Sequence, residues 1–251
     1  MSGLLRSFFR GRRNKGETAC CAVVAAAGSA LRMEGQDKIL IPLNGEPLLA
    51  HTLRPLEECP LIREIIVVTR NDLIVDVGNL CKDYSFTKTT KIIVGGNTRM
   101  KSVLAGISEV PGNMRLIAIH DGARPFVTQE LLKEVILRAA ECAAAAPALP
   151  VKDTVKRARN GVVEETLQRS ELYSVQTPQV FEAALIKGAL LKALRDQAEL
   201  TDDCAAVERL GMKVALTRGN EENIKITTPN DLLIAEAILE RRQENENWTR
   251  I

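Results

Sequence analysis

Short runs rich in Val, Ile and Ala recur at strand length through the first half of the chain, and segments with apolar residues at helical spacing separate them. The strand-like runs lie at residues 20–25, 64–69, 91–94 and 115–120, and the helical patterns begin at residues 47, 72 and 98. Strands that alternate with helices form parallel sheets, because a crossover helix returns the chain to the same edge. The pattern therefore predicts a Rossmann-like α/β fold, with a mostly parallel sheet and helices on both of its faces.

The second half of the chain continues this alternation. We expect a helix at 128–145, a strand at 146–150, helices at 181–197 and 201–210, strands at 213–217 and 223–227, and a final helix from Pro229 to about Arg242. One interruption lies at residues 152–179, where apolar and polar side chains alternate around the turn sequence Arg-Asn-Gly at 159–161. An isolated hairpin is marginal in water, so we expect this one to pack on something else, and another subunit is the obvious candidate.

Length and composition suit one large domain, which we place at residues 19–243, with a tail at 244–251. Residues 1–18 carry five Lys or Arg and one Glu, and we expect a disordered basic extension there rather than a membrane-surface segment. The rest of the chain is then slightly acidic, which argues against nucleic-acid binding. The sequence contains neither an apolar run of roughly 18 residues nor cysteines at metal-site spacing, so we predict a cytoplasmic protein with reduced thiols and no stable membrane association.

In an open parallel sheet, ligands bind beyond the carboxyl ends of the strands. The segment after the first predicted strand contains Ala26, Ala27, Gly28, Ser29, Arg32 and Lys38. Small side chains let backbone N–H groups approach an anion, and the two cations would neutralise its charge. This segment lacks the GxGxxG of dinucleotide sites and the GK[ST] ending of Walker loops. By itself it could also be a plain turn with solvated cations.

Later segments repeat the theme. Gly95-Gly96-Asn97-Thr98-Arg99, with Ser102, predicts a flexible turn that could approach a base or ribose, or else a simple strand-to-helix turn. In the segment 120–125, Asp121 is suited to ribose hydroxyls or to Mg2+, although it could merely pair with Arg124. We interpret His120 as a buried, hydrogen-bonded support rather than a catalyst.

Two further sets of side chains are candidates on weaker grounds. Lys225 lies between Ile224 and Ile226 in a predicted strand, and a lysine on a core strand is usually at an edge or in a site. The chain has two histidines and no Ser/His/Asp or Cys/His constellation, which disfavours covalent catalysis. Hydroxyl and guanidinium groups of the kind that bind a phosphorylated polyol occur at Thr154, Arg169, Thr177 and Thr201.

Several of these segments, in their order along the chain, resemble one known family. The motifs AAAGSALRM with Lys38, GGNTRMKSV, HDGARPF, VKDTVKR, QTPQ, TDD and NIKITTPND are similar to those of the 2-C-methyl-D-erythritol 4-phosphate cytidylyltransferases, over residues 20 to about 240. The resemblance implies transfer of CMP from CTP to methylerythritol phosphate with release of pyrophosphate. It also implies Mg2+ as cofactor and a homodimer that exchanges a protruding β-arm, here at about residues 151–172.

The same resemblance implies roles for individual residues. The catalytic cations around the reacting phosphate would be Arg32, Lys38 and Lys225. The cytidine and phosphate cradle would consist of Ala26, Ala27, Gly28, Ser29, Gly96, Asn97, Ser102 and Asp121, with Asp121 also near the metal. Methylerythritol phosphate would be bound by Arg124, Thr154, Arg169, Thr177 and Thr201, with Arg169 serving the partner's site.

Three alternatives stay open. The nearest is ribitol 5-phosphate cytidylyltransferase, which shares the first loop, QTPQ and the NIK segment, whereas HDGARPF and TDD favour the methylerythritol family. A sugar-phosphate nucleotidylyltransferase with another nucleotide is more distant. A catalytically silent nucleotide-binding scaffold would share the fold, because fold does not establish function. We expect direct attack without a general base, since the substrate phosphate is already an anion, with fixed cations stabilising the developing charge.

Overall fold

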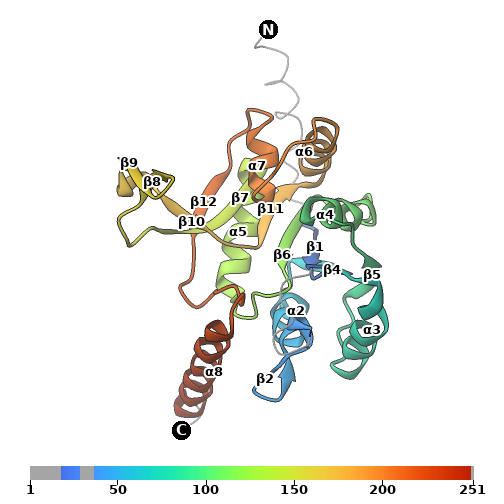
Figure 1. Cartoon of the computed structure of the whole chain (residues 1–251). Coiled ribbons are helices and arrows are strands. Elements are labelled where there is room, and N and C mark those ends of the chain that lie inside the picture. Colours follow the sequence, from blue (N-terminus) through green and yellow to red (C-terminus); the bar gives the residue numbers. More distant parts are fainter. Residues whose placement is uncertain (1–17, 29–36, 250–251) are drawn as a thin grey trace.

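The computed structural model describes residues 18–28 and 37–249, and their core is an eight-stranded sheet (Figure 1). Its parallel half contains β1 (Cys20–Ala25), β4 (Ile62–Thr69), β5 (Thr89–Val94) and β6 (Leu116–Asp121). These strands lie in the order β6-β1-β4-β5, and each neighbouring pair is parallel. The predicted α/β fold with a mostly parallel sheet is confirmed.

The other half of the sheet is mixed. It contains β7 (Ala144–Pro150), β10 (Tyr173–Val175), β11 (Gln179–Glu182) and β12 (Ala215–Arg218). β11 is antiparallel to both β6 and β7, β10 is antiparallel to β7, and β12 is parallel to β7. Two of these strands, β10 and β11, were not predicted, because they lie in or next to the segment that we assigned to a single hairpin. The chain that follows the hairpin enters the main sheet instead.

Helices cover both faces of the sheet, as expected. One face packs against α2 (Leu48–Glu58), α3 (Ile74–Asp83) and α5 (Gln129–Cys142), and the other against α4 (Arg99–Ser108), α6 (Ala183–Arg195) and α7 (Asp203–Glu208). The alternation of side chains along β1 shows why: Ala22 and Val24 contribute to the first apolar cluster, and Val23 to the second. Fully buried parallel strands therefore read as continuous apolar runs.

Several element boundaries differ from the sequence-based prediction. The helix expected at 128–145 ends at Cys142, because Ala143 adopts a left-handed conformation with φ 71° and β7 starts at Ala144. The final helix α8 (Pro229–Thr249) extends beyond the expected end near Arg242. The structure also has a small hairpin, β2 (Pro42–Leu43) and β3 (Glu46–Pro47), ahead of α2. Among the described residues, no helix is long and apolar enough to cross a membrane.

The strand predicted at residues 223–227 is wrong. Ile226 donates its backbone N–H to the carbonyl of Ala123, and no ladder of strand pairing forms in this described segment. The apolar alternation that suggested a strand has another cause, since Ile226 packs with Phe126 and Ala235 in a separate cluster beneath α8, with Ile224 at its margin. Residues 223–227 are thus an extended segment held against the loop after β6.

The predicted β-arm is present as β8 (Lys156–Arg159) and β9 (Val162–Thr166), which pair only with each other in the described chain. Asn160 and Gly161 take the positive φ values, 51° and 79°, that such a tight turn requires. Every residue of both strands is exposed, and Figure 1 shows the arm standing away from the main sheet.

Candidate active site

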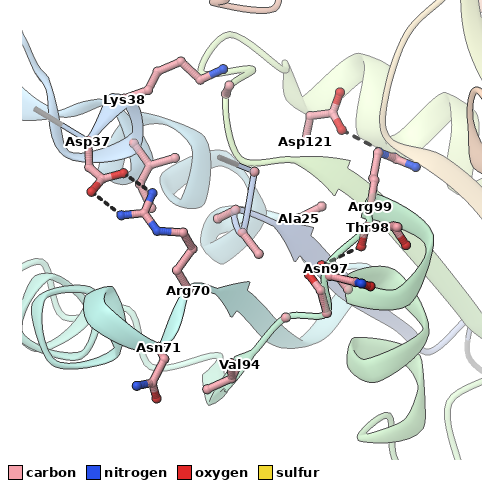
Figure 2. A pocket seen from close by; sticks show the side chains of 18 of the residues that line it. Ala25, Asp37, Lys38, Arg70, Asn71, Val94, Asn97, Thr98, Arg99 and Asp121 are labelled. Atoms are coloured by element: carbon pink, nitrogen blue, oxygen red, sulfur yellow. Dashed lines mark hydrogen bonds and ion pairs between the residues drawn. The ribbon is translucent and has the colours of Figure 1, made fainter. Parts of the chain in front are cut away.

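The order of the strands places a cleft at the carboxyl edge of β1. The chain runs from β1 to β4 and β5 on one side and then crosses to β6 on the other side of β1. At such a switch point the loops diverge and leave room for a ligand. The cleft there has a volume of about 530 Å³, and its lining comes from the segments that follow β1, β4, β5 and β6, together with Lys225. Figure 2 shows these side chains converging from separate elements.

Three of these segments pack closely, because the one after β1 contacts those after β5 and β6. A Cβ atom added to Gly95 would lie 2.6 Å from the Cβ of Ala27, and one added to Gly122 would lie 2.9 Å from the Cβ of Ala26. Neither glycine has a positive φ, so both are required by close approach and not by an unusual backbone conformation. The close approach at Gly95 is a second reason for glycine in this turn, beside the conformational freedom that the sequence predicts.

The first turn of α4 faces the cleft. The Thr98 side chain caps the helix by accepting a hydrogen bond from the N–H of Lys101 at 3.2 Å. The buried Ser102 hydroxyl lies 3.1 Å from the carbonyl oxygen of Gly96 and 2.9 Å from that of Thr98. Helix N-termini favour anions, because their first N–H groups lack partners within the helix. Gly96, Asn97 and Ser102 thus line the cleft at a helix N-terminus, a position that suits an anion.

Asp121 ends β6 and is the centre of the charges in the cleft. Its side chain is 9% exposed, and its oxygens lie 2.9 Å from Lys225 Nζ, 3.4 Å from an Arg99 nitrogen and 3.6 Å from Arg124 Nε. Burial raises the pKa of Asp121, but the charges of Arg99 and Lys225 outweigh it and lower the pKa to about 2. Asp121 is therefore ionised at neutral pH, in a surrounding of excess positive charge.

Lys38 lies beyond the first loop and lines the same cleft. Burial lowers the pKa of its amine, and the positive charge of Lys225 lowers it further. Asp121 and Asp231 oppose these two effects. Because the charge of Lys225 disfavours the charged form of Lys38, an anion bound beside Lys38 would relieve this repulsion.

His120 and Thr177 form a chain of hydrogen bonds next to Asp121, and the donor of each bond can be assigned. The backbone N–H of Asp121 donates to the Thr177 hydroxyl at 3.1 Å, that hydroxyl lies 3.0 Å from His120 Nδ1, and His120 Nε2 lies 3.1 Å from the carbonyl of Arg124. A carbonyl only accepts, so Nε2 carries the proton and Thr177 donates to Nδ1. Burial lowers the pKa of His120 to about 4. The structure thus places both residues as supports of the β6 loop, in keeping with our interpretation of His120.

The segment that carries Lys225 is held by side chains instead of a sheet. Arg124 donates to the carbonyl of Asn223 at 2.6 Å, and the buried Asn223 amide donates to the carbonyl of Thr177 at 2.9 Å. Gln176 donates to the carbonyl of Asn220 and accepts from its N–H. Arg124 and Thr177, which we predicted as substrate ligands, are therefore engaged in fixing the loop beside the cleft.

Arg99 is a cleft residue that the sequence analysis did not single out. Its guanidinium bridges Asp121 and Asp203, with an Asp203 contact of 2.7 Å, and the Asp203 side chain is 2% exposed. Burial lowers the pKa of Arg99, but the negative charges of Asp203 and Asp121 more than reverse this effect and raise it. Gln179 completes the contact by accepting from the N–H groups of Asp203 and Cys204. The TDD motif thus supports the cleft from behind.

The predicted site residues divide into four groups, one of which is Arg124 and Thr177 in the loop beside the cleft. The cleft is lined by Ala26, Ala27, Gly28, Lys38, Gly96, Asn97, Ser102, Asp121 and Lys225. Thr154, Arg169 and Thr201 are exposed and do not line it, and Arg169 donates to the carbonyl of Lys152 at the base of the arm. Ser29 and Arg32 lie outside the described residues.

A mostly parallel sheet with a lysine-lined cleft at its switch point defines an α/β protein built to hold an anionic ligand such as a nucleotide. A family model described as 2-C-methyl-D-erythritol 4-phosphate cytidylyltransferase matches residues 20–241. The protein of that name from Halalkalibacterium halodurans is 44% identical over 222 residues, which cover 88% of this chain and 97% of the relative. The one from Bacillus licheniformis is 40% identical over 226 residues, covering 90% and 97%.

Solved structures agree with the sequence comparisons. The 2-C-methyl-D-erythritol 4-phosphate cytidylyltransferase from Thermus thermophilus superposes with a TM-score of 0.74 at 32% identity, covering 87% of this chain and 98% of that one. The 4-diphosphocytidyl-2C-methyl-D-erythritol synthase from Anaerococcus prevotii gives a TM-score of 0.80 at 32% identity, with 90% and 97% covered. The chain belongs to the 2-C-methyl-D-erythritol 4-phosphate cytidylyltransferase family, and the resemblance noted in the sequence is confirmed.

Proposed function

We propose that this chain transfers CMP from CTP to the phosphate of 2-C-methyl-D-erythritol 4-phosphate, forming 4-diphosphocytidyl-2-C-methyl-D-erythritol and pyrophosphate. This is the reaction named for the family to which the chain belongs. The observation that supports it in this chain is the convergence of Lys38, Lys225 and Asp121 on the switch-point cleft, with Lys225 Nζ 2.9 Å from Asp121. This arrangement provides the excess positive charge that a triphosphate and a second phosphate require.

The step is a direct displacement at phosphorus. A phosphate oxygen of methylerythritol phosphate forms a bond to the α-phosphorus of CTP, and the bond from that phosphorus to the bridging oxygen of pyrophosphate breaks. The attacking phosphate is already an anion, so no proton has to be removed. His120 agrees with this assignment, since both of its ring nitrogens are engaged with Thr177 and Arg124. Lys38 and Lys225 stabilise the charge on the crowded phosphorus and on the leaving group.

The carboxylate of Asp121 fits a magnesium ion that is held chiefly by the nucleotide. Mg2+ commonly binds one or two carboxylates together with substrate phosphates. Among the described residues no group of three or more acidic, His or Cys side chains converges, and a pKa of about 2 keeps Asp121 ionised. Bound there, Mg2+ would offset triphosphate charge. Lys225 and Arg99 hold the carboxylate in place.

We also propose that the chain forms a homodimer in which Arg169 of the arm serves the partner's site. All residues of β9 are exposed, and its apolar side chains Val162 and Val163 are 67% and 55% exposed. Apolar side chains on such a hairpin gain stability when a second copy covers them. Thr154 and Arg169 lie on the arm or at its base, away from the cleft of their own chain.

All six cysteines are free thiols, which favours a reducing compartment such as the cytoplasm.

The test is pyrophosphate release with Mg2+ and each of CTP, UTP, ATP and GTP, using methylerythritol phosphate and ribitol 5-phosphate in parallel. We expect release with CTP and methylerythritol phosphate alone. Release with ribitol 5-phosphate alone would transfer the chain to the ribitol enzymes. Folded protein that binds CTP but releases no pyrophosphate with either acceptor would favour a silent scaffold.

A further inference from the structure

An ion-pair cluster lies at the cleft wall opposite Asp121, and nothing in the function described above uses it. Arg70 contacts Asp37 through two hydrogen bonds of 2.5 Å, Nη1 to Oδ1 and Nη2 to Oδ2. The same guanidinium contacts Asp72 at 3.0 Å through Nε and at 2.7 Å through Nη2. Figure 2 shows the Arg70–Asp37 pair beside Lys38, away from Asp121 and Arg99. Asp37 and Arg70 both line the cleft.

Arg70 is fixed at a rigid position. It directly follows β4, whose last five residues, from Ile65 to Thr69, are buried, and β4 pairs with both β1 and β5. Two carboxylates occupy its nitrogens, and its side chain is 26% exposed. A planar guanidinium held by a bidentate contact has little freedom to turn. The core sheet therefore holds Asp37 in place through one side chain.

Asp37 immediately precedes Lys38. Its backbone carbonyl accepts a hydrogen bond from the N–H of Leu40 at 2.9 Å, which closes the short turn Lys38–Leu40. The Asp37 side chain does not cap this turn, because it is used by Arg70. Because Asp37 begins this turn, the position of Asp37 sets the direction in which the Lys38 side chain leaves the backbone.

We propose that Arg70 is a positioning residue for nucleotide binding: by clamping Asp37 to the end of β4, it fixes the turn that directs Lys38 into the cleft. The inference rests on the proposed function, since it assumes that Lys38 meets the triphosphate. Sequence reasoning gave no signal for it, because Arg70 and Asp37 are 33 residues apart and neither belongs to a motif that we singled out.

The variants Arg70→Ala and Asp37→Ala test the proposal, each made alone and in a Lys38→Ala background. Each single variant should lower kcat/KM for CTP about tenfold and weaken CTP binding by a similar factor, measured by calorimetry without the acceptor. The double variant should be no worse than the poorer single variant, because both break the same connection. In the Lys38→Ala background, Arg70→Ala should add less than about a twofold effect.

Two outcomes would overturn the proposal. If Asp37→Ala left CTP binding at the wild-type value while Arg70→Ala weakened it, the role of Arg70 would be to neutralise a carboxylate and not to position Lys38. An undiminished effect of Arg70→Ala in the Lys38→Ala background would show that Arg70 acts independently of Lys38. Arg70→Lys should fall between wild type and Arg70→Ala, since lysine cannot form the two-point contact.

Controls separate this inference from the proposed function and from simple unfolding. Lys91→Ala removes an exposed ion pair with Glu109 outside the cleft and should leave CTP binding unchanged. Thermal unfolding of each variant should remain cooperative. If the wild-type protein neither bound CTP nor released pyrophosphate, the proposed function would fail, whereas a normal wild type with unaffected Arg70 and Asp37 variants would refute the positioning role alone.

Discussion

The cleft and the β-arm are built in opposite ways. Around the cleft, side chains connect residues far apart in the sequence, such as Arg99 to Asp203 and Arg124 to Asn223. In β8 and β9 of the arm, the side-chain contacts stay within the hairpin, as between Lys156 and Thr166, whereas Lys152 at the base of the arm pairs with Glu221. The cleft is therefore braced within one chain, whereas the arm has no packing partner among the residues that the structure describes. The part of the expected site around the cleft is assembled within one chain, and the part on the arm would need the second copy that we propose.

The largest expected effect is on the part assembled within one chain. Lys225→Ala should lower turnover about 100-fold or more, because the proposed mechanism uses this cation to stabilise the charge developing at phosphorus. Steady-state kinetics with CTP and methylerythritol phosphate measure this effect. Lys192→Ala, which breaks an exposed pair with Asp196 on α6, is the matched control and should remain near wild type. Near-normal turnover by folded Lys225→Ala would remove Lys225 from the mechanism.

The ion pair between Arg99 and Asp203 should contribute to the free energy of unfolding. Arg99→Met leaves the buried Asp203 carboxylate without its guanidinium and should lower the free energy of unfolding by about 3 kcal/mol. The matched variant on the arm, Arg157→Met, breaks an exposed pair with Glu165 and should cost less than about 1 kcal/mol. Urea unfolding of the two variants compares the regions directly. Equal losses would contradict the contrast drawn between them.

The two regions should also differ in their response to acid. The pKa of His120 is about 4 in the folded protein, below its ordinary value of 6.5, so the unfolded chain takes up this proton first. Stability should therefore fall by about 2 kcal/mol between about pH 7 and about pH 5. The stabilisation from Asp121, with its pKa lowered from 3.8 to about 2, is retained above about pH 4.

Urea unfolding as a function of pH measures this loss. His120→Gln should flatten the dependence, and His51→Gln is the control for the other histidine, whose pKa burial also lowers. An unchanged slope in His120→Gln would show that other groups cause the acid sensitivity. The arm, which has no histidine between residues 151 and 172, should contribute nothing over this range.

The smallest expected effect is on activity in mixed dimers, which tests whether Arg169 of the arm acts in the cleft of the partner subunit. Lys38→Ala and Arg169→Ala homodimers should each be impaired. If Arg169 acts across the interface, a mixed dimer contains one intact site, and random mixing should restore activity to about a quarter of wild type. Native mass spectrometry verifies that mixed dimers have formed. Verified mixed dimers without recovered activity would place Arg169 in the site of its own chain.

The parallel half of the sheet could be predicted because its strands are buried on both faces and read as apolar runs. The mixed half was harder, since β10 is only three residues long and β11 only four, which is too short for a clear alternation. Ile224 and Ile226 misled the prediction of a strand because the apolar pattern records burial beneath α8 and not sheet pairing.

The same limit applies to the site. Loops at the carboxyl ends of strands can be located from topology, and most of the cleft lining was predicted in this way. Arg99 was missed because its role depends on Asp203, which is 104 residues away, and Arg70 was missed because Asp37 is 33 residues away. Local patterns contain no record of such contacts. The sequence likewise indicated that the arm would protrude, but not what covers it.

The contact between Ala26 and Gly122 has a consequence for how this cleft can change over time. A Cβ at residue 122 would lie 2.9 Å from that of Ala26 and 3.2 Å from the carbonyl oxygen of Ala25. A larger side chain in one loop therefore requires a smaller one, or a shifted backbone, in the other. Substitutions at these two positions should be epistatic, and Gly122→Ala should be tolerated better with Ala26→Gly than alone. Any lineage that reshapes its nucleotide cleft here must change both loops together.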